Sequence, residues 1–140
     1  MANNVQYGAT YRGTLSAPFN TAVGSAGLAK LWVGTQPANC GTADVAIGNL
    51  LATWTFGAAW GTVNSPSNGI ITAINPVTAG VAAPNSGVAG HFRIYTSALV
   101  CVMQGTAGLT SGFDWNLTNT NISAGQIITF TSMSITFFGA

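Results

Sequence analysis

Few side chains in this sequence have the types needed for acid–base chemistry. Asp44 and Asp114 are the only carboxylates and His91 is the only histidine. A glycosidase needs two carboxyl groups about 5–10 Å apart, and these two aspartates could meet only through folding. Asp44 lies in the turn-like stretch GTADV and Asp114 between two aromatic residues, which favours solvated turn and strand-face roles. We therefore expect no catalytic carboxylate pair.

Metal and nucleophile chemistry have equally little support in the residue types. A zinc site needs several imidazole or thiolate ligands, whereas His91 stands alone, and Cys40 and Cys101 form no CxxC motif. His91 could act as a lone base, but it shares the parity of Arg93 and Tyr95 in HFRIY, which favours a structural place in a polar or interface-facing row. Neither a GxSxG elbow nor a phosphate loop occurs. We expect no enzyme activity, metal, cofactor or small-molecule substrate.

The compartment of synthesis bears on the two cysteines. The N-terminal stretch MANNVQYGATYRG lacks the apolar segment of a signal peptide, so we expect synthesis in the cytoplasm. A reducing compartment favours two buried free thiols over a structural disulfide between Cys40 and Cys101, although the disulfide stays open as the alternative.

Charge is scarce throughout the chain. Charged residues make up 4% of the sequence and the formal net charge is +1, whereas about 25% is ordinary. Three scattered cations cannot neutralise a phosphate backbone, which argues against nucleic acid as the partner. The longest apolar run, at residues 98–103, is far shorter than the roughly 20 residues of a membrane helix. Because copies of such a chain hardly repel one another, we expect a dimer or trimer.

The elements that must position these residues are strands. Apolar alternation recurs between clusters of Gly, Pro, Asn and Ser, whereas helical spacing is scarce. We expect one antiparallel two-sheet sandwich of jelly-roll type with about eight strands. Residues 28–138 would form its core, residues 1–20 would form an extended arm, and Ser97–Ala98 would close a hairpin. The expected strands are 5–11, 28–34, 50–56, 69–74, 90–96, 99–104, 113–117 and 126–138.

The last of these stretches, QIITFTSMSITFF, changes its inward face. Ile128 and Phe130 share one parity, whereas the apolar residues after Ser132 share the other. The change predicts a bulge or a crossing between two sheets; the alternative is one continuous strand buried on both faces. An uncharged segment of this kind aggregates if it forms an open edge, so the native protein must pair or cover it.

Aromatic residues provide most of the candidate contacts with a partner. Trp32 and Trp54 lie mid-strand, which predicts burial. Trp60 lies in a glycine-rich context and the N-terminal tyrosines lie in the arm, where aromatic anchors suit an interface. Arginines could fix the register with the partner through ion pairs. The expected contacts are Val5, Tyr7, Tyr11, Arg12, Trp60 and Arg93.

Several stretches taken together resemble a known family. They are AKLWVGTQPAN at 29–39, LLATWTFG at 50–57, GHFRIY at 90–95 and LTNTNISAGQIITFTSMSIT at 117–136. Over about residues 28–137 the chain resembles the jelly-roll cement, or decoration, proteins of tailed-phage heads, short-tailed Bordetella phages among them. The resemblance implies synthesis in the host cytoplasm, a place on the outer surface of the capsid, and major capsid protein as the partner. It implies no catalytic residues.

Two other functions remain open on the sequence alone. A tail-fibre or receptor-binding β module would bind cells, although the chain lacks the repeats of a fibre stalk. A carbohydrate-binding or enzymatic jelly roll would need an exposed aromatic platform with carboxylates nearby.

Overall fold

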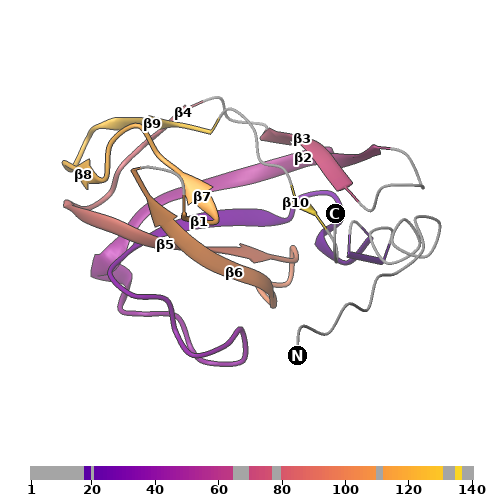
Figure 1. Ribbon diagram of the computed structural model, residues 1–140, viewed down its shortest axis with the longest axis horizontal. Coiled ribbons are helices and arrows are strands. Elements are labelled where there is room, and N and C mark those ends of the chain that lie inside the picture. The colour runs from indigo at the N-terminus through magenta and orange to yellow at the C-terminus, as the bar shows by residue number, and fades with distance from the viewer. Residues whose placement is uncertain are drawn as a thin grey trace, which may run out of the picture.

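The computed structural model of the protein describes residues 18–19, 21–64, 70–76, 80–109, 112–130 and 135–136; for residues 58–64, 70–76 and 135–136 it describes the backbone alone. These residues are nearly all β (Figure 1). Residues 18–19 and 21–23 are helical, and a 3-10 turn spans Ile47–Asn49. The strands are β1 (Leu28–Val33), β2 (Leu50–Asn64), β3 (Ile70–Pro76), β4 (Gly80–Ala82), β5 (Gly87–Tyr95), β6 (Cys101–Gly108), β7 (Trp115–Asn116), β8 (Asn121–Ile122), β9 (Ile127–Thr129) and β10 (Ile135–Thr136).

The strands form one large curled sheet and one small sheet. The order in the large sheet is β10-β3-β2-β1-β5-β6-β7, with β8 paired to the start of β5, and β4 pairs with β9 separately. The pairs are antiparallel except β6–β7, which is parallel. The all-β prediction is therefore confirmed, but the purely antiparallel arrangement is wrong because β7 returns alongside β6. Figure 1 shows the curl of the large sheet, with β4, β8 and β9 gathered at one end.

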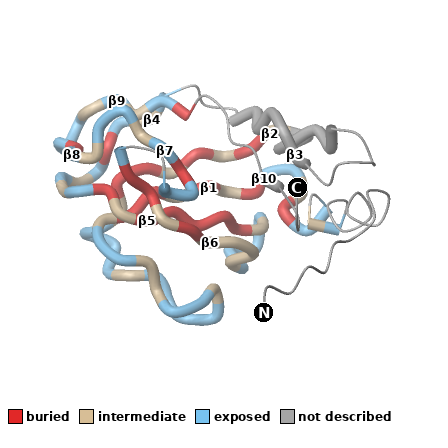
Figure 2. Tube along the Cα trace, viewed as in Figure 1, coloured by how far each residue is buried: buried red, intermediate tan, exposed pale blue. Residues whose placement is uncertain are grey.

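Alternation along the central strands builds the core on one face of the sheet. Ala29 and Leu31 of β1 belong to the same apolar cluster as Trp54 of β2, and Figure 2 shows the buried stretches along the central strands. Four aromatic rings make the centre of this cluster, with ring centroids 4.8–5.5 Å apart. These four rings are Trp54, Phe92, Trp115 and Phe130. The predicted burial of Trp32 and Trp54 is confirmed.

The C-terminal stretch passes from one sheet to the other. β9 pairs with β4 in the small sheet, whereas β10 pairs with β3 in the large one. Phe130, directly after β9, is buried in the aromatic cluster, which confirms the parity assigned to it. The predicted crossing between sheets is confirmed, and the exact point of the change, Thr131–Ser132, lies outside the described residues.

Several strand and turn boundaries differ from those expected from the sequence. The expected hairpin between β5 and β6 is confirmed, but its turn runs from Thr96 to Val100, where the Thr96 N–H donates to the Val100 carbonyl at 2.9 Å. Between the expected strands 69–74 and 90–96 the chain also forms β4 and the first residues of β5. No strand was expected there because glycines and proline interrupt the pattern, yet β4 pairs with β9 and the start of β5 pairs with β8. Residues 1–17, and with them the predicted strand 5–11 and most of the predicted arm, lie outside the described residues.

Candidate functional site

Polar side chains gather on the sheet face opposite the aromatic core. In the register of β1 and β5, Trp32 pairs with His91 and Lys30 with Arg93. The intervening residues of both strands belong to the apolar cluster, so these polar residues point away from it. The predicted row of His91, Arg93 and Tyr95 is therefore confirmed. The row is buried rather than interface-facing, because the β1–β2 connection contributes polar groups that bond to it.

Arg93 is the centre of a polar cluster that this row forms with the β1–β2 connection. Only 1% of the Arg93 surface is exposed. Its Nη1 donates to the Asp44 carboxylate at 2.6 Å and to the Thr42 carbonyl at 3.0 Å. Its Nη2 donates to the Asn39 carbonyl, and both Nε and Nη2 donate to Gln104 Oε1, at 2.9–3.1 Å. A guanidinium has five N–H donors, and five bonds are present. Arg93 was expected to contact a partner; in this structure the chain itself surrounds its side chain, and the contact with a partner stays a prediction.

Asp44 is an ion-pair partner and not the solvated turn residue that the sequence predicted. Its Oδ1 accepts from Arg93 and, at 2.5 Å, from the Tyr95 hydroxyl, while Lys30 Nζ lies 3.8 Å from Oδ2. Burial raises the pKa of this carboxyl, but the hydrogen bonds and the two cations outweigh burial and hold the pKa below its ordinary value. Burial and the adjacent carboxylate together raise the pKa of Tyr95. The pair is thus ionised Asp44 and neutral Tyr95.

His91 is buried and held by the backbone. Its Nδ1 lies 2.8 Å from the Gly34 carbonyl oxygen, which can only accept, so Nδ1 carries the proton. Its ring stacks on Trp32 with centroids 6.4 Å apart. Among the described residues, Nε2 has no hydrogen-bond partner. Burial lowers the pKa of His91, against the opposing effect of the Gly34 carbonyl. A buried neutral ring of this kind fits the structural role expected for it.

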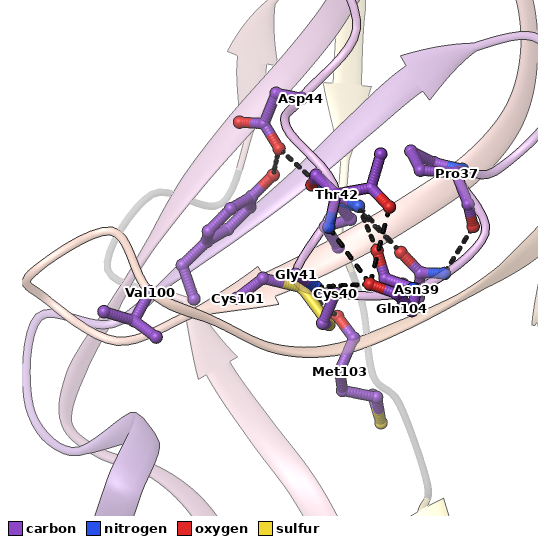
Figure 3. The surroundings of a disulfide bond; sticks show 12 residues. Pro37, Asn39, Cys40, Gly41, Thr42, Asp44, Val100, Cys101, Met103 and Gln104 are labelled. Atoms are coloured by element: carbon purple, nitrogen blue, oxygen red, sulfur yellow. Dashed lines mark hydrogen bonds and ion pairs between the residues drawn. A yellow bond between two sulfur atoms is a disulfide. The ribbon is translucent and has the colours of Figure 1, made fainter.

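A disulfide fastens the β1–β2 loop to the cluster. Cys40 and Cys101 are bonded, with Cα atoms 5.3 Å apart, within the usual range. Figure 3 shows the bond beside Gln104, whose Nε2 donates to the Pro37 carbonyl at 2.6 Å. The preference for free thiols is wrong, because the loop bends back over β5 and β6 and brings Cys40 to the start of β6. The expected strands 28–34 and 50–56 left this segment as a connection, and the disulfide fixes it against the sheet.

The cluster leaves the described surface almost without charge. Lys30 and Asp44 have 15% and 31% of their side chains exposed, and Arg93 is buried. The remaining charged residue in the described part of the chain is Asp114, whose Oδ2 accepts from the Thr106 N–H and hydroxyl at 2.8 Å. Asp114 is exposed in a bend directly before β7, so it is solvated as expected but does not lie on a strand face. The surface is therefore built of amides, hydroxyls and apolar groups.

The other predicted contact residues are not placed by the structure. Val5, Tyr7, Tyr11 and Arg12 lie outside the described residues, and Trp60 lies in β2 with its side chain outside them. The sequence reasoning overlooked Gln104 and Thr42 as partners of Arg93. Gln104 could have been found from the sequence, because in a β5–β6 hairpin its side chain points to the same face of the sheet as that of Arg93. Thr42 could not, since its backbone carbonyl makes the contact.

Within the described ranges, no group of three or more His, Cys, Asp or Glu residues could hold a metal ion. None of the described helical segments is long and apolar enough to cross a membrane. Comparison with protein-family models, with curated proteins and with solved structures gave no match.

Proposed function

We propose that the protein is a structural component of a phage virion, which binds the outer face of the capsid and stabilises it by bridging major capsid protein subunits. The sequence resemblance supplies the class of protein. The observation that carries the proposal is the placement of charge: three of the five charged residues, Lys30, Asp44 and Arg93, form the internal cluster. The protein therefore presents a nearly neutral surface to its partner.

A neutral surface suits permanent attachment to a large protein shell. Charged patches accelerate encounter and select partners, whereas buried aromatic and aliphatic anchors supply most interface energy. A decoration protein that touches two subunits can use weak contacts, because the second contact is intramolecular once the first is made. The internal cluster and the disulfide keep the domain rigid. A load applied at the contact with one capsid subunit therefore reaches the contact with the other.

We also propose that the large sheet and the β4–β9 pair are the two layers of a jelly-roll sandwich. The passage of the chain from β9 into β10 connects the layers. Phe130, between them in sequence, packs on Trp54 of the large sheet with centroids 5.5 Å apart. A layered core of this kind is what a sandwich requires.

We propose a non-enzymatic role, without cofactor, nucleic acid, membrane or small-molecule substrate. Both carboxylates accept structural hydrogen bonds, and the only histidine is buried. Trp115, the aromatic residue of the pocket between β7, β8 and β9, is also buried. Trp115 therefore offers no exposed platform for a sugar ring in that pocket.

The test uses phage heads that lack this protein. We expect such heads to keep their shape but to release DNA at a lower temperature, and added protein to restore the release temperature. Because attachment does not depend on exposed charge, restoration at roughly 0.5 M salt should nearly equal that at roughly 0.05 M, although the screening length changes several-fold. Added protein should leave complete heads unchanged. Heads that hold DNA equally well without it, or protein found only on the tail, would refute the capsid role.

A further inference from the structure

The exposed apolar residues gather at the two ends of one hairpin. Seven large hydrophobic residues are exposed in the described part of the chain. Two of them lie in the turn between β5 and β6, and three line a groove at the opposite end of the same strands. Figure 1 shows this turn at the right-hand ends of β5 and β6. The turn residues are Leu99 and Val100; the groove residues are Val88, Leu109 and Phe113.

The turn holds its two apolar side chains outward in a fixed conformation. Leu99 and Val100 are each 59% exposed. The Thr96 hydroxyl accepts from the Ala98 and Val100 N–H groups at 3.2–3.3 Å, and the disulfide at Cys101 follows directly. Leu99 has φ of 62°, a left-handed conformation that is unfavourable for leucine. A strained, exposed leucine in a well-bonded turn suits a preformed contact.

The groove at the other end is apolar and open. It has a volume of about 480 Å³ and is lined by the first residues of β5, the last residues of β6 and the segment Gly34–Gln36. Gly108 makes its wall possible: a Cβ there would lie 2.4 Å from the Phe113 ring. Asp114 follows Phe113 in sequence and is not among the residues that line the groove; its carboxylate accepts from Thr106. The groove therefore offers an apolar surface to an uncharged aliphatic side chain.

The turn and the groove cannot meet within one chain. About eight residues of β5 separate Val88 from Thr96, which is roughly 26 Å at the usual rise of a strand. Both features are uncharged and apolar, one convex and one concave. We propose that the Leu99–Val100 turn of one copy inserts into the Val88–Leu109–Phe113 groove of a second copy.

This contact is heterologous, because it joins different patches on the two copies. Such contacts close into rings or continue as chains. Two side chains bury far less than the roughly 800 Å² per partner of a stable interface, so free copies associate weakly. Copies held side by side on a surface, at an effective concentration of ~1 mM, would be linked. The proposal concerns the isolated protein and needs no capsid.

Complementary variants provide the test. Leu99→Asn/Val100→Thr removes the turn's apolar side chains while keeping a residue that tolerates positive φ, and Val88→Thr/Leu109→Ser weakens the groove. Ile47→Ser, at an exposed apolar residue elsewhere, is the control. In sedimentation at ~1 mM, we expect wild type and control to grow in average size relative to dilute samples. Each double variant alone should not grow, and an equal mixture of the two should recover one contact per pair.

A photo-crosslinking residue at Val100 gives the direct readout. We expect crosslinks to Val88, Leu109 or Phe113 of another copy, identified by mass spectrometry with isotope-mixed chains. The variant turn should leave the melting temperature equal or higher, because the strain at residue 99 is relieved. Crosslinks between two Val100 positions would indicate a symmetric contact and overturn the proposal. So would a mixture that fails to recover association, or wild type without concentration dependence.

Discussion

Replacing Asp44 by asparagine should destabilise the fold far more than the same change at Asp114. Asp44→Asn keeps the size of the side chain but removes the anion beside Arg93, a guanidinium with 1% exposure that lies 2.6 Å from it. The substitution also leaves the Tyr95 hydroxyl and Lys30 without their carboxylate. Removing one partner of a buried ion pair costs about 3–5 kcal/mol.

The expected magnitude is lower than that range because Asp44 itself is 31% exposed. Water reaches the partly exposed side chain at position 44, and the Thr42 and Asn39 carbonyls and Gln104 still accept from Arg93. We therefore expect a loss of about 2–3 kcal/mol in the free energy of unfolding. At this chain length 1 kcal/mol corresponds to roughly 2–4 °C, so the melting temperature should fall by about 5–10 °C.

Thermal and urea unfolding of the oxidised protein measure the loss. Asp114→Asn is the matched control, since its carboxylate is exposed and bonded only to Thr106, and it should lose about 1 kcal/mol or less. The wild-type protein should also lose stability as the pH falls below 3.8, the ordinary pKa of Asp44, because the folded pKa is lower. The Asp44→Asn variant should lack most of that acid dependence. Equal effects of the two substitutions would refute the central role of the Arg93–Asp44 pair.

Three further predictions follow from the same contacts. In the wild type, burial lowers the pKa of His91, so the unfolded chain takes up the proton first and stability falls as the pH drops below 6.5. His91→Asn, which can keep a donor toward Gly34, should remove this loss of stability below pH 6.5, as measured by urea unfolding across that pH. Cys40→Ser/Cys101→Ser should lose about 2–4 kcal/mol in urea unfolding, because the bond closes a loop between residues 61 positions apart; a stability equal to that of wild type would contradict this. Deletion of residues 2–12, which contain Val5, Tyr7 and Tyr11, should leave a folded domain that decorates heads poorly; a truncated chain that unfolds by circular dichroism would make the segment part of the core.

Alternation along the strands predicted much of the fold. It assigned Trp32 and Trp54 to buried positions and placed His91, Arg93 and Tyr95 on one face, because side chains in a strand point alternately to opposite sides. It also predicted that the chain either bulges or changes sheet after Phe130, and the structure shows the change of sheet. These predictions depend on local geometry alone, which explains their success.

The cluster itself could not be predicted in the same way. The two-residue turn expected at Ser97–Ala98 would pair Arg93 with residue 102, whereas the longer turn pairs it with Gln104. The contacts of Arg93 with Asn39 and Thr42 use backbone carbonyls, which every residue has. The disulfide depends on the path of the same loop. No pattern of residue types encodes where an irregular loop returns to the sheet.

The position of the charges changes how the chain's low charge content is understood. Arg93 was expected to set the register with a partner, but its donors are all engaged within the chain. Lys30 lies over the Tyr95 ring at 4.7 Å and near Asp44, so it also serves the fold. Charges that fix a loop onto a sheet are removed from the surface, and salt then has little to screen there. The same few ionic residues thus explain how the β1–β2 loop is fastened to the sheet and why so little charge remains on the described surface.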